Sequence, residues 1–370
     1  MTYFVKESDH KDAKIISDFN EDLKNHDINF KLPLSDTKNL NADDFISINN
    51  FILLDDKTKV RAGYTLKSQW FKINNEILQI GYYYNPVSAG LYNKKYNFCG
   101  LMLLNDAQKK NKNLFSLGMG GFSEPLPKLL KSLNWDLQSV PFFFKIYNTN
   151  NFLKNIKHLK NTKLKYFLIE ILTKTGLGWL LIKFISLLTS IFNMQFKKKI
   201  SVTVAEINQF DEELNFVWDK TKENKSFSAI RNTTYLKTLY EDKRFIKLKF
   251  SENNKVVGWS ISLCTKLNNH KHFGQMRLGS IVDCLCLKGY EDSVVRETSN
   301  LLKSKGVDLI VSNQSHIFWK KAFKINSFLK GPSNFIFASS KILSDRLKDK
   351  IESKNYIHLT RGDGDGPINL

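Results

Sequence analysis

The stretch Ser88–Lys110, SAGLYNKKYNFCGLMLLNDAQKK, passes from small and basic residues into an apolar run that ends in lysines. It follows the aromatic, β-prone segment Glu76–Tyr84, and its second half, Gly100–Lys110, has the apolar start and basic finish of a helix. The pattern therefore predicts a strand, a basic turn and a helix, in that order. Backbone N–H groups at such a helix start bind phosphate groups. Lys94 and Lys95 would suit a pyrophosphate there, although the same residues also fit an ordinary basic turn.

The alternation of strands and helices extends to both sides of this stretch and forms two blocks. The first block has expected strands at Tyr3–Val5, Phe51–Leu54, Val60–Trp70, Glu76–Tyr84, Leu114–Leu117 and Val140–Tyr147, and helices at Asp9–Asn25, Gly100–Lys110 and Ser123–Leu133. The second has strands at Ser201–Glu206, Phe245–Phe250, Val256–Leu263, Gly279–Leu287, Val307–Ser312 and Asn334–Ser339, and helices at Phe210–Lys222, Thr233–Asp242, Glu291–Lys305 and Ser315–Lys324. At 370 residues the chain is too long for one compact core, so two α/β or α+β units with mixed sheets are predicted.

The most apolar stretch of the chain, Leu164–Phe196, lies between the two blocks. Lys174 and Lys183 interrupt it, and its longest uncharged piece, Phe184–Phe196, is shorter than the ~20 residues that a membrane span needs. Lysines flank the stretch on both sides. It therefore fits either a helical linker packed against the domains or a segment lying on an anionic membrane surface.

The overall charge is strongly basic, with 56 Lys and Arg against 36 Asp and Glu and a formal net charge of +20. Such a charge is typical of proteins that bind nucleic acid or anionic membranes. The lysines are spread over the whole chain, however, so no specific nucleic-acid site is expected. The four cysteines show no CxxC spacing, and neither a metal site nor a disulfide framework is expected. The opening residues, MTYFVKESDHKD, contain no apolar signal segment, which predicts a cytoplasmic protein, free or at the inner face of the plasma membrane.

Two consecutive units of this size and element order resemble a tandem of GCN5-related N-acyltransferase (GNAT) folds, the architecture also used by Fem-type aminoacyl transferases. The family's loop has a basic residue or glutamine, two variable positions, glycine, one variable position, and glycine or alanine. Lys95 matches the first position and Gly100 the last, whereas Phe98 stands at the middle glycine. The resemblance implies that acetyl-CoA or another acyl-CoA is the co-substrate. The residues implied to bind it are Lys95, Asn97, Cys99, Gly100 and Leu101.

The second block departs further from the family's loop, because only Gly289 within Lys288–Asp292 matches it. The first block is therefore predicted to bind the acyl-CoA. The predicted domains are an N-terminal GNAT-like domain at 1–150, an apolar helical linker at 151–199, a C-terminal GNAT-like domain at 200–343 and a tail at 344–370.

Acyl transfer to an amine needs a base for the amine proton, backbone donors for the oxyanion and an acid for the leaving thiolate. In the GNAT fold these backbone donors come from the splayed central strand, here Tyr82–Ser88. The resemblance makes Tyr84 and Tyr92 candidate acids. An aromatic-rich strand is also typical of a plain core.

Polar residues of the second block add further candidates. Asp283 lies in an apolar strand, where a buried carboxylate must find a partner or shift its pKa, and it is a candidate catalytic residue. Asn313, Ser315 and His316 follow a strand at the sheet edge where ligands bind in α/β proteins. His316 is a candidate general base, and Asn313 and Ser315 are candidate substrate ligands. The same group also fits a helix start capped by Ser315.

The chain ends in IHLTRGDGDGPINL, in which Asp363 and Asp365 alternate with glycines. An EF-hand loop has this alternation, but no glutamate follows, so calcium is not expected. The segment Leu309–Ser340 and the tail resemble a set of GNAT-like proteins that often belong to bacterial surface-polysaccharide pathways. That resemblance implies a tail that folds back so that both aspartates face the acceptor. A disordered terminus is the alternative.

Together these observations predict an acyl-CoA-dependent N-acyltransferase, most simply an acetyltransferase. Its acceptor would be an amino sugar or related amine, as a small molecule or on a lipid carrier, in cell-surface polysaccharide synthesis. One alternative is a Fem-like aminoacyl transferase that uses charged tRNA. Another is a non-catalytic, peripheral membrane scaffold that binds the membrane surface through Leu164–Phe196.

Overall fold

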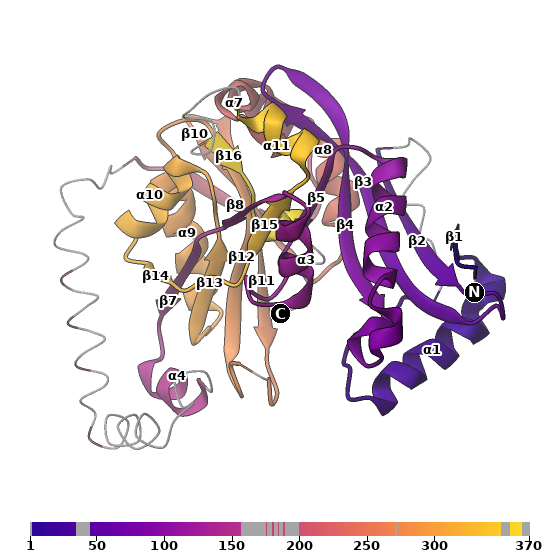
Figure 1. Ribbon diagram of the computed structural model, residues 1–370. Helices are drawn as coiled ribbons and strands as arrows, with labels where there is room; N and C mark the ends of the chain where they lie inside the picture. Colours follow the sequence, from indigo (N-terminus) through magenta and orange to yellow (C-terminus); the bar gives the residue numbers. More distant parts are fainter. Residues whose placement is uncertain are drawn as a thin grey trace. The chain divides into compact units, whose positions relative to one another are not determined.

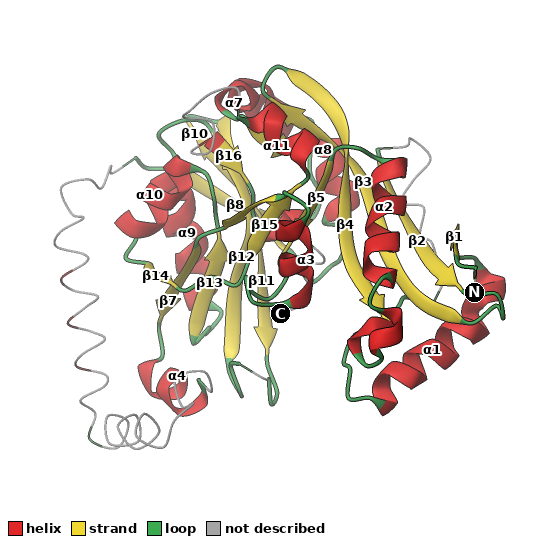
Figure 2. Cartoon of the chain, viewed as in Figure 1, coloured by secondary structure: helices red, strands yellow, loops and turns green. Residues whose placement is uncertain are grey.

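A computed structural model describes residues 2–34, 45–156, 200–270, 272–348 and 356–364, together with Thr175, Leu180, Phe184 and Leu188 (Figures 1 and 2). The chain forms two compact units. Unit 1 comprises Met1–Ser139 and Asn334–Ser353, and unit 2 comprises Val140–Ser333 and Lys354–Leu370. Each unit contains a mixed sheet with helices, which confirms the predicted α/β class.

Unit 1 is built on a sheet with the strand order β1-β2-β3-β4-β5-β15-β6. Its strands are β1 (Phe4–Glu7), β2 (Ile46–Leu54), β3 (Val60–Ile73), β4 (Glu76–Ser88), β5 (Leu114–Leu117), β15 (Ile336–Ser339) and β6 (Asp136–Ser139). Its helices are α1 (Ala13–Asn25), α2 (Cys99–Lys110), α3 (Pro125–Ser132) and α11 (Lys341–Leu347). β4 and β5 are parallel, whereas the other neighbours are antiparallel. Apolar side chains of α1, α2 and α3 form a core with one face of this sheet.

Unit 2 is built on a sheet with the order β14-β7-β13-β12-β11-β10-β8, in which β12 and β13 are parallel. Its strands are β7 (Phe142–Ile146), β8 (Thr203–Ile207), β9 (Phe227–Ala229), β10 (Ile246–Glu252), β11 (Lys255–Lys266), β12 (Arg277–Cys286), β13 (Leu309–Asn313), β14 (Leu329–Gly331) and β16 (Ile357–His358). Its helices are α4 (Thr149–Asn155), α7 (Glu213–Thr221), α8 (Thr233–Leu239), α9 (Glu291–Ser304) and α10 (Ile317–Ile325). The short strands β9 and β16 pair in parallel.

The hairpins of both units depend on asparagines that accept left-handed backbone conformations. β10 and β11 are joined at Asn253 and Asn254, whose φ angles are 49° and 62°. Two consecutive positive φ values are what a tight type I′ hairpin turn requires. Asn74, between β3 and β4, has a φ of 51°. These turns form the β3–β4 and β10–β11 hairpins. The parallel strand β5 then pairs with β4 in unit 1, whereas β13 pairs with β12, the strand that follows β11, in unit 2.

Each sheet is completed by a strand from the opposite half of the chain. β7 follows β6 of unit 1 in sequence, yet it pairs with β13 and β14 in unit 2. β15 follows β14, yet it pairs with β5 and β6 in unit 1. The compact units therefore differ from the linear ranges 1–150 and 200–343. Strand propensity can be recognised locally, whereas the choice of partner depends on long-range pairing.

The range 151–199, expected to be a helical linker, is described only in part. Its first residues belong to α4, and the apolar segment Leu164–Phe196 lies outside the described residues apart from four single positions. Within the part of the chain that the structure describes, no helix has the length and apolar character needed to cross a membrane. All four cysteines are free thiols.

Candidate functional site

In unit 1 the two parallel strands of the sheet separate soon after they meet. β4 and β5 pair at Gly81 with Leu114 and at Tyr82 with Phe115. At the next residue, the carbonyl of Tyr83 accepts a hydrogen bond from the hydroxyl of Ser116, with an oxygen–oxygen distance of 2.6 Å. A side chain thus takes over where the backbone ladder stops. The splayed central strand expected from the sequence is present.

The separation leaves one backbone amide directed at the opening. Gly81 donates its N–H toward the β5 side, to the carbonyl of Asn113, and Tyr84 is paired with Thr65 of β3. Backbone groups alternate between the two neighbours of a strand, so the peptide after Tyr84 directs its carbonyl to β3 and the Asn85 N–H to the opposite side. The register shifts here, and Asn85 has a φ of 50°. The Asn85 amide therefore lies where β5 has already turned away.

The helix that follows β4 begins without a cap. α2 starts at Cys99, and no side chain caps its first turn, which also contains no acidic residue. The preceding loop places Lys94, Lys95 and Asn97 at the surface. Gly100 has open space around it, since a Cβ there would meet only Leu129, at 3.6 Å. These amides and lysines are suited to an anion such as a diphosphate.

Three aromatic residues of this loop pack back onto unit 1. Tyr92 stacks on His26, with ring centroids 4.1 Å apart. Tyr96 lies under the guanidinium of Arg61, at 4.8 Å. Phe98, which replaces the family's middle glycine, packs edge-on against Tyr3 with ring centroids 4.9 Å apart.

The two tyrosines considered as acids lie in different surroundings. Tyr84 is half-buried, and its ring stacks on Tyr82 with centroids 4.9 Å apart. Tyr92 donates its hydroxyl to the carboxylate of Asp22. Burial, with that carboxylate beside it, raises the pKa of Tyr92 above its ordinary range. Tyr84 is therefore better placed than Tyr92 to act as the acid.

Unit 2 has the same separation of parallel strands. β12 and β13 pair from Leu278 with Leu309 to Ile281 with Ser312, and the Ser312 hydroxyl then donates to the Ile281 carbonyl, at 2.8 Å. Two residues further along β12 lies Asp283, only 2% exposed. The position that holds Asn85 in unit 1 thus holds a buried carboxylate in unit 2.

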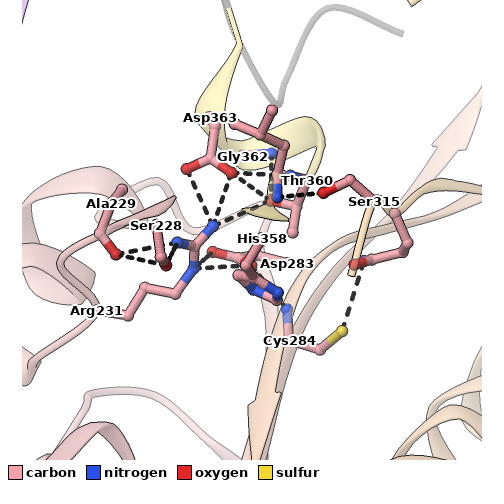
Figure 3. Close-up of polar contacts among 12 residues, drawn as sticks. Ser228, Ala229, Arg231, Asp283, Cys284, Ser315, His358, Thr360, Gly362 and Asp363 are labelled. Carbon is pink, nitrogen blue, oxygen red and sulfur yellow. Dashed lines mark hydrogen bonds and ion pairs between the residues drawn. The ribbon is translucent and has the colours of Figure 1, made fainter. Parts of the chain in front are cut away.

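A fully buried arginine, Arg231, joins Asp283 to the C-terminal tail (Figure 3). Its Nε is 3.0 Å from Oδ2 of Asp283, and its Nη2 is 2.7 Å from Oδ2 of Asp363. Its Nη1 donates to the Ser228 hydroxyl and the Ala229 carbonyl. Every N–H group of the guanidinium therefore has an acceptor. This ion-pair cluster consists of Arg231, Asp283, Asp363, Tyr240 and His358.

The cluster carries two carboxylates for one guanidinium. Burial raises the pKa of Asp283, and the neighbouring Asp363 adds to that effect against the attraction of Arg231. Tyr240 donates its hydroxyl to Asp283 at 2.8 Å. His358 Nε2 lies 3.9 Å from Asp283 Oδ1, and neither ring nitrogen has a hydrogen-bond partner among the described residues. Burial and the charge of Arg231 lower the pKa of His358 well below its ordinary value.

The tail residues and the residues after β13 hold each other. Asn313 accepts a hydrogen bond from Arg361, at 3.1 Å. Ser315 donates to the Ile357 carbonyl and accepts from the Leu359 amide, so its hydroxyl is committed to the tail. The structure thus brings Asn313, Ser315, Asp283 and Asp363 into one region of unit 2, where their polar groups bind each other. Asp365 lies outside the described residues.

His316 is the N-cap of α10 and is 4% exposed. Its Nδ1 accepts from the Phe318 amide at 3.4 Å, and its Nε2 lies 3.2 Å from the Asn224 carbonyl. Burial lowers the pKa of His316 to about 4. The side chain lines a small pocket together with Lys225 and Glu291. Both ring nitrogens are used, which assigns His316 to the helix start.

The sequence did not indicate three members of the ion-pair cluster, namely Arg231, Tyr240 and His358. One signal was available for the arginine. The chain has seven arginines among 56 basic residues, and a buried aspartate in an apolar strand needs a cation that can donate from several atoms. Nothing in the sequence indicated Tyr240 or His358.

Of three comparisons with known proteins, only the one with solved structures finds similar proteins. No protein-family model matches the sequence, and no curated protein matches it. A GCN5-related N-acetyltransferase from Anabaena variabilis ATCC 29413 matches with a TM-score of 0.53 and 7% identity, over 91% of this chain and 72% of that one. A GCN5-related glucosamine N-acetyltransferase region of a fungal multi-domain GH3 β-N-acetylglucosaminidase gives 0.50 and 12%, over 91% and 38%. A tandem GNAT protein from the clavulanic acid biosynthesis pathway gives 0.47 and 8%, over 91% and 98%.

At these identities the likeness concerns the fold. Both units have the antiparallel hairpins, the splayed parallel pair and the helix between its two strands. The chain therefore has the fold of the GCN5-related N-acetyltransferases, twice in tandem, as its sequence predicted.

Proposed function

We propose that the protein is an acyl-CoA-dependent N-acyltransferase whose donor binds to unit 1. The observation that carries this proposal is the opening between β4 and β5, which lies next to an uncapped helix start without acidic residues. Similarity in fold to N-acetyltransferases supports the same reaction class. The groups that we propose to act are the loop before α2, the Asn85 amide and the Tyr84 hydroxyl.

The donor's diphosphate would bind to the first amides of α2 and to Lys95. Unsatisfied N–H groups at a helix start carry partial positive charge, and a lysine beside them adds a full charge. Asn97, Cys99, Gly100 and Leu101 supply the surrounding backbone. The acyl thioester would then extend from this loop toward the opening between the strands.

The Asn85 N–H would stabilise the oxyanion in the acyl transfer. The acceptor's amine nitrogen attacks the thioester carbon, a C–N bond forms, and negative charge develops on the carbonyl oxygen. The C–S bond then breaks, the amine loses one proton to water, and the leaving sulfur takes one proton. We propose that the Tyr84 hydroxyl donates this second proton to the sulfur and is then protonated again from solvent. The products are an amide and free CoA thiol.

The acceptor that we propose is the amine of an amino sugar, in cell-surface polysaccharide synthesis. One structure of similar fold is a glucosamine N-acetyltransferase region, which supports this class of acceptor. A sugar amine, free or on a lipid carrier at the inner face of the plasma membrane, would meet the enzyme in the cytoplasm. The test therefore begins with glucosamine.

Calorimetry with acetyl-CoA and mass spectrometry of glucosamine after incubation with both compounds test the proposal. We expect acetyl-CoA binding that saturates at or below millimolar concentration. We also expect glucosamine to gain the mass of one acetyl group. Gly100→Glu places a carboxylate in the first turn of α2 and should abolish binding by repelling the diphosphate.

Asn105→Glu is the matched control, because it adds the same charge to an exposed position in the middle of α2. It should leave donor binding within about twofold of the wild type. Absence of heat for the wild type at millimolar acetyl-CoA would reject this donor. Equal binding by the Gly100→Glu variant would reject the site.

A further inference from the structure

We propose that Arg61 is a positioning residue for the acyl-CoA loop, which is the segment 89–98. In this role Arg61 holds the loop so that the first amides of α2 face the diphosphate. The inference rests on the proposed function, because it concerns the same binding site. Arg61 belongs to β3 and is distant from the loop in sequence, so the residues of the loop do not indicate this role.

A buried carboxylate fixes the guanidinium of Arg61. Asp55 is fully buried, and its Oδ2 accepts from Arg61 Nε and Nη2, each at 2.8 Å. Its Oδ1 accepts from the amides of Lys57 and Lys59, at 3.0 Å and 2.9 Å. Burial alone would raise the pKa of Asp55, but the Lys59 amide and Arg61 hold it below its ordinary value. The carboxylate therefore stays ionised, and a two-point ion pair sets the plane of the guanidinium.

The loop begins and ends against this fixed group. Ala62, the residue after Arg61, is paired with Ser88 at the end of β4, so the loop starts beside Arg61. The loop then returns, and the ring of Tyr96 lies 4.8 Å from the Arg61 guanidinium carbon. Tyr96 is 7% exposed and precedes the N-cap residue Phe98 by two positions. Arg61 thus contacts the loop immediately before its amides turn into α2.

Further contacts within the loop hold its start and its end close together. A Cβ at Gly90 would lie 2.8 Å from the Tyr96 carbonyl oxygen, so the start and end of the loop touch closely. The Tyr96 amide also donates to the Asn93 carbonyl, at 3.0 Å. Because α2 has no side-chain cap, the position of its first amides depends on this loop. Loss of the Arg61–Tyr96 contact would let the loop shift, which would weaken the hold on a diphosphate.

The experiment compares two donors, acetyl-CoA and acetyl-pantetheine, which has the same thioester and no nucleotide diphosphate. Arg61→Lys keeps the charge beside Asp55 and removes the flat group that stacks on Tyr96. We expect its Kd for acetyl-CoA to rise about tenfold, while kcat/KM with acetyl-pantetheine stays within twofold of the wild type. Arg346→Lys is the matched control in unit 1, since Arg346 is an exposed arginine paired with Glu76. It should match the wild type with both donors.

Tyr96→Leu approaches the same contact from the loop side and serves if Arg61→Lys fails to fold. It should show the same split between the two donors, and the double variant should be no worse than the poorer single variant. If Arg61→Lys and Tyr96→Leu bind acetyl-CoA as the wild type does, or lose both donors equally, Arg61 has no positioning role. A wild type that binds no acetyl-CoA overturns the proposed function itself.

Discussion

Both units contain two parallel strands that separate, but different groups lie at the point of separation. In unit 1 a serine hydroxyl, that of Ser116, bonds to the Tyr83 carbonyl where β4 and β5 separate. In unit 2 Ser312 does the same for Ile281 where β12 and β13 separate. Two residues further on, unit 1 presents a backbone amide at Asn85, and unit 2 presents the buried carboxylate of Asp283. The fold thus provides an opening in each unit, and the side chains decide what fills it.

The helix starts show the same contrast. α2 of unit 1 has no acidic residue in its first turn, whereas α9 of unit 2 has Glu291 and Asp292 there. The Glu291 carboxylate accepts the amide of Gly289, at 2.8 Å, in the loop directly before the helix, where its negative charge would repel a phosphate. The start of α9 has no side-chain cap either, but it carries these two carboxylates, and the tail residue Asp363 joins Asp283 through Arg231 where the strands of unit 2 separate. Among the described residues, the start of α2 is therefore better suited to an anion than the start of α9, and four predictions test the contrast.

The largest effect is expected from the ion-pair cluster of unit 2. Arg231→Met leaves Asp283 and Asp363 buried without their cation, which costs about 3–5 kcal/mol of folding free energy. Urea-induced unfolding of the variant and the wild type measures the loss. Arg244→Met is the matched control, because Arg244 is exposed and pairs with Asp242 at the surface. It should cost less than about 1 kcal/mol.

The origin of the loss can be tested with a second variant. Replacing both Asp283 and Asp363 by asparagine in the Arg231→Met background removes the unpaired charges. Part of the lost stability should then return, because the cost arises from buried carboxylates rather than from lost packing. A triple variant as unstable as Arg231→Met would show that packing of the arginine dominates.

The next effect concerns pH and the buried histidine at the start of α10. The pKa of His316 falls from 6.5 to about 4 on burial, so protonation favours the unfolded chain. Its contribution to stability is full above pH 6.5 and is lost as the pH falls from 6.5 toward 4, by about 3 kcal/mol in all. His316→Asn keeps a side chain that caps helices and removes the titration. Unfolding free energies measured from pH 7 to pH 4 should fall less steeply for the variant, and parallel curves would contradict the assignment.

A smaller effect is expected where the tail approaches the cluster. A Cβ at Gly362 would lie 2.1 Å from the Tyr240 hydroxyl oxygen, so Gly362→Ala should displace the tail at a cost of about 2 kcal/mol. Limited proteolysis should then cut the tail sooner than in the wild type. Tyr240→Phe removes the clashing oxygen, and the double variant should be cut more slowly than Gly362→Ala alone. No difference between these two variants would place the strain elsewhere.

The sequence predicted the fold, but it did not indicate the contacts that form the ion-pair cluster of unit 2. Helix α2 could be placed because its segment has an apolar start and a basic finish, which suit a helix and its dipole. The exchange of β7 and β15 could not, since pairing partners leave no local trace. Asp283 was recognised as a buried charge that needs a partner, yet its partner Arg231 lies 52 positions away. Contacts of that range follow from the folded chain alone.

The smallest effect compares one lysine in each unit. Lys95→Glu reverses a charge beside the uncapped start of α2, and we expect donor affinity to fall about fivefold. Lys288→Glu makes the same change in the loop before α9, where Glu291 already occupies an amide. Acetyl-CoA titrations of the two variants should therefore differ, with Lys288→Glu close to the wild type. The reverse order would move the donor site to unit 2, since a charge matters most at the helix start that holds the phosphates.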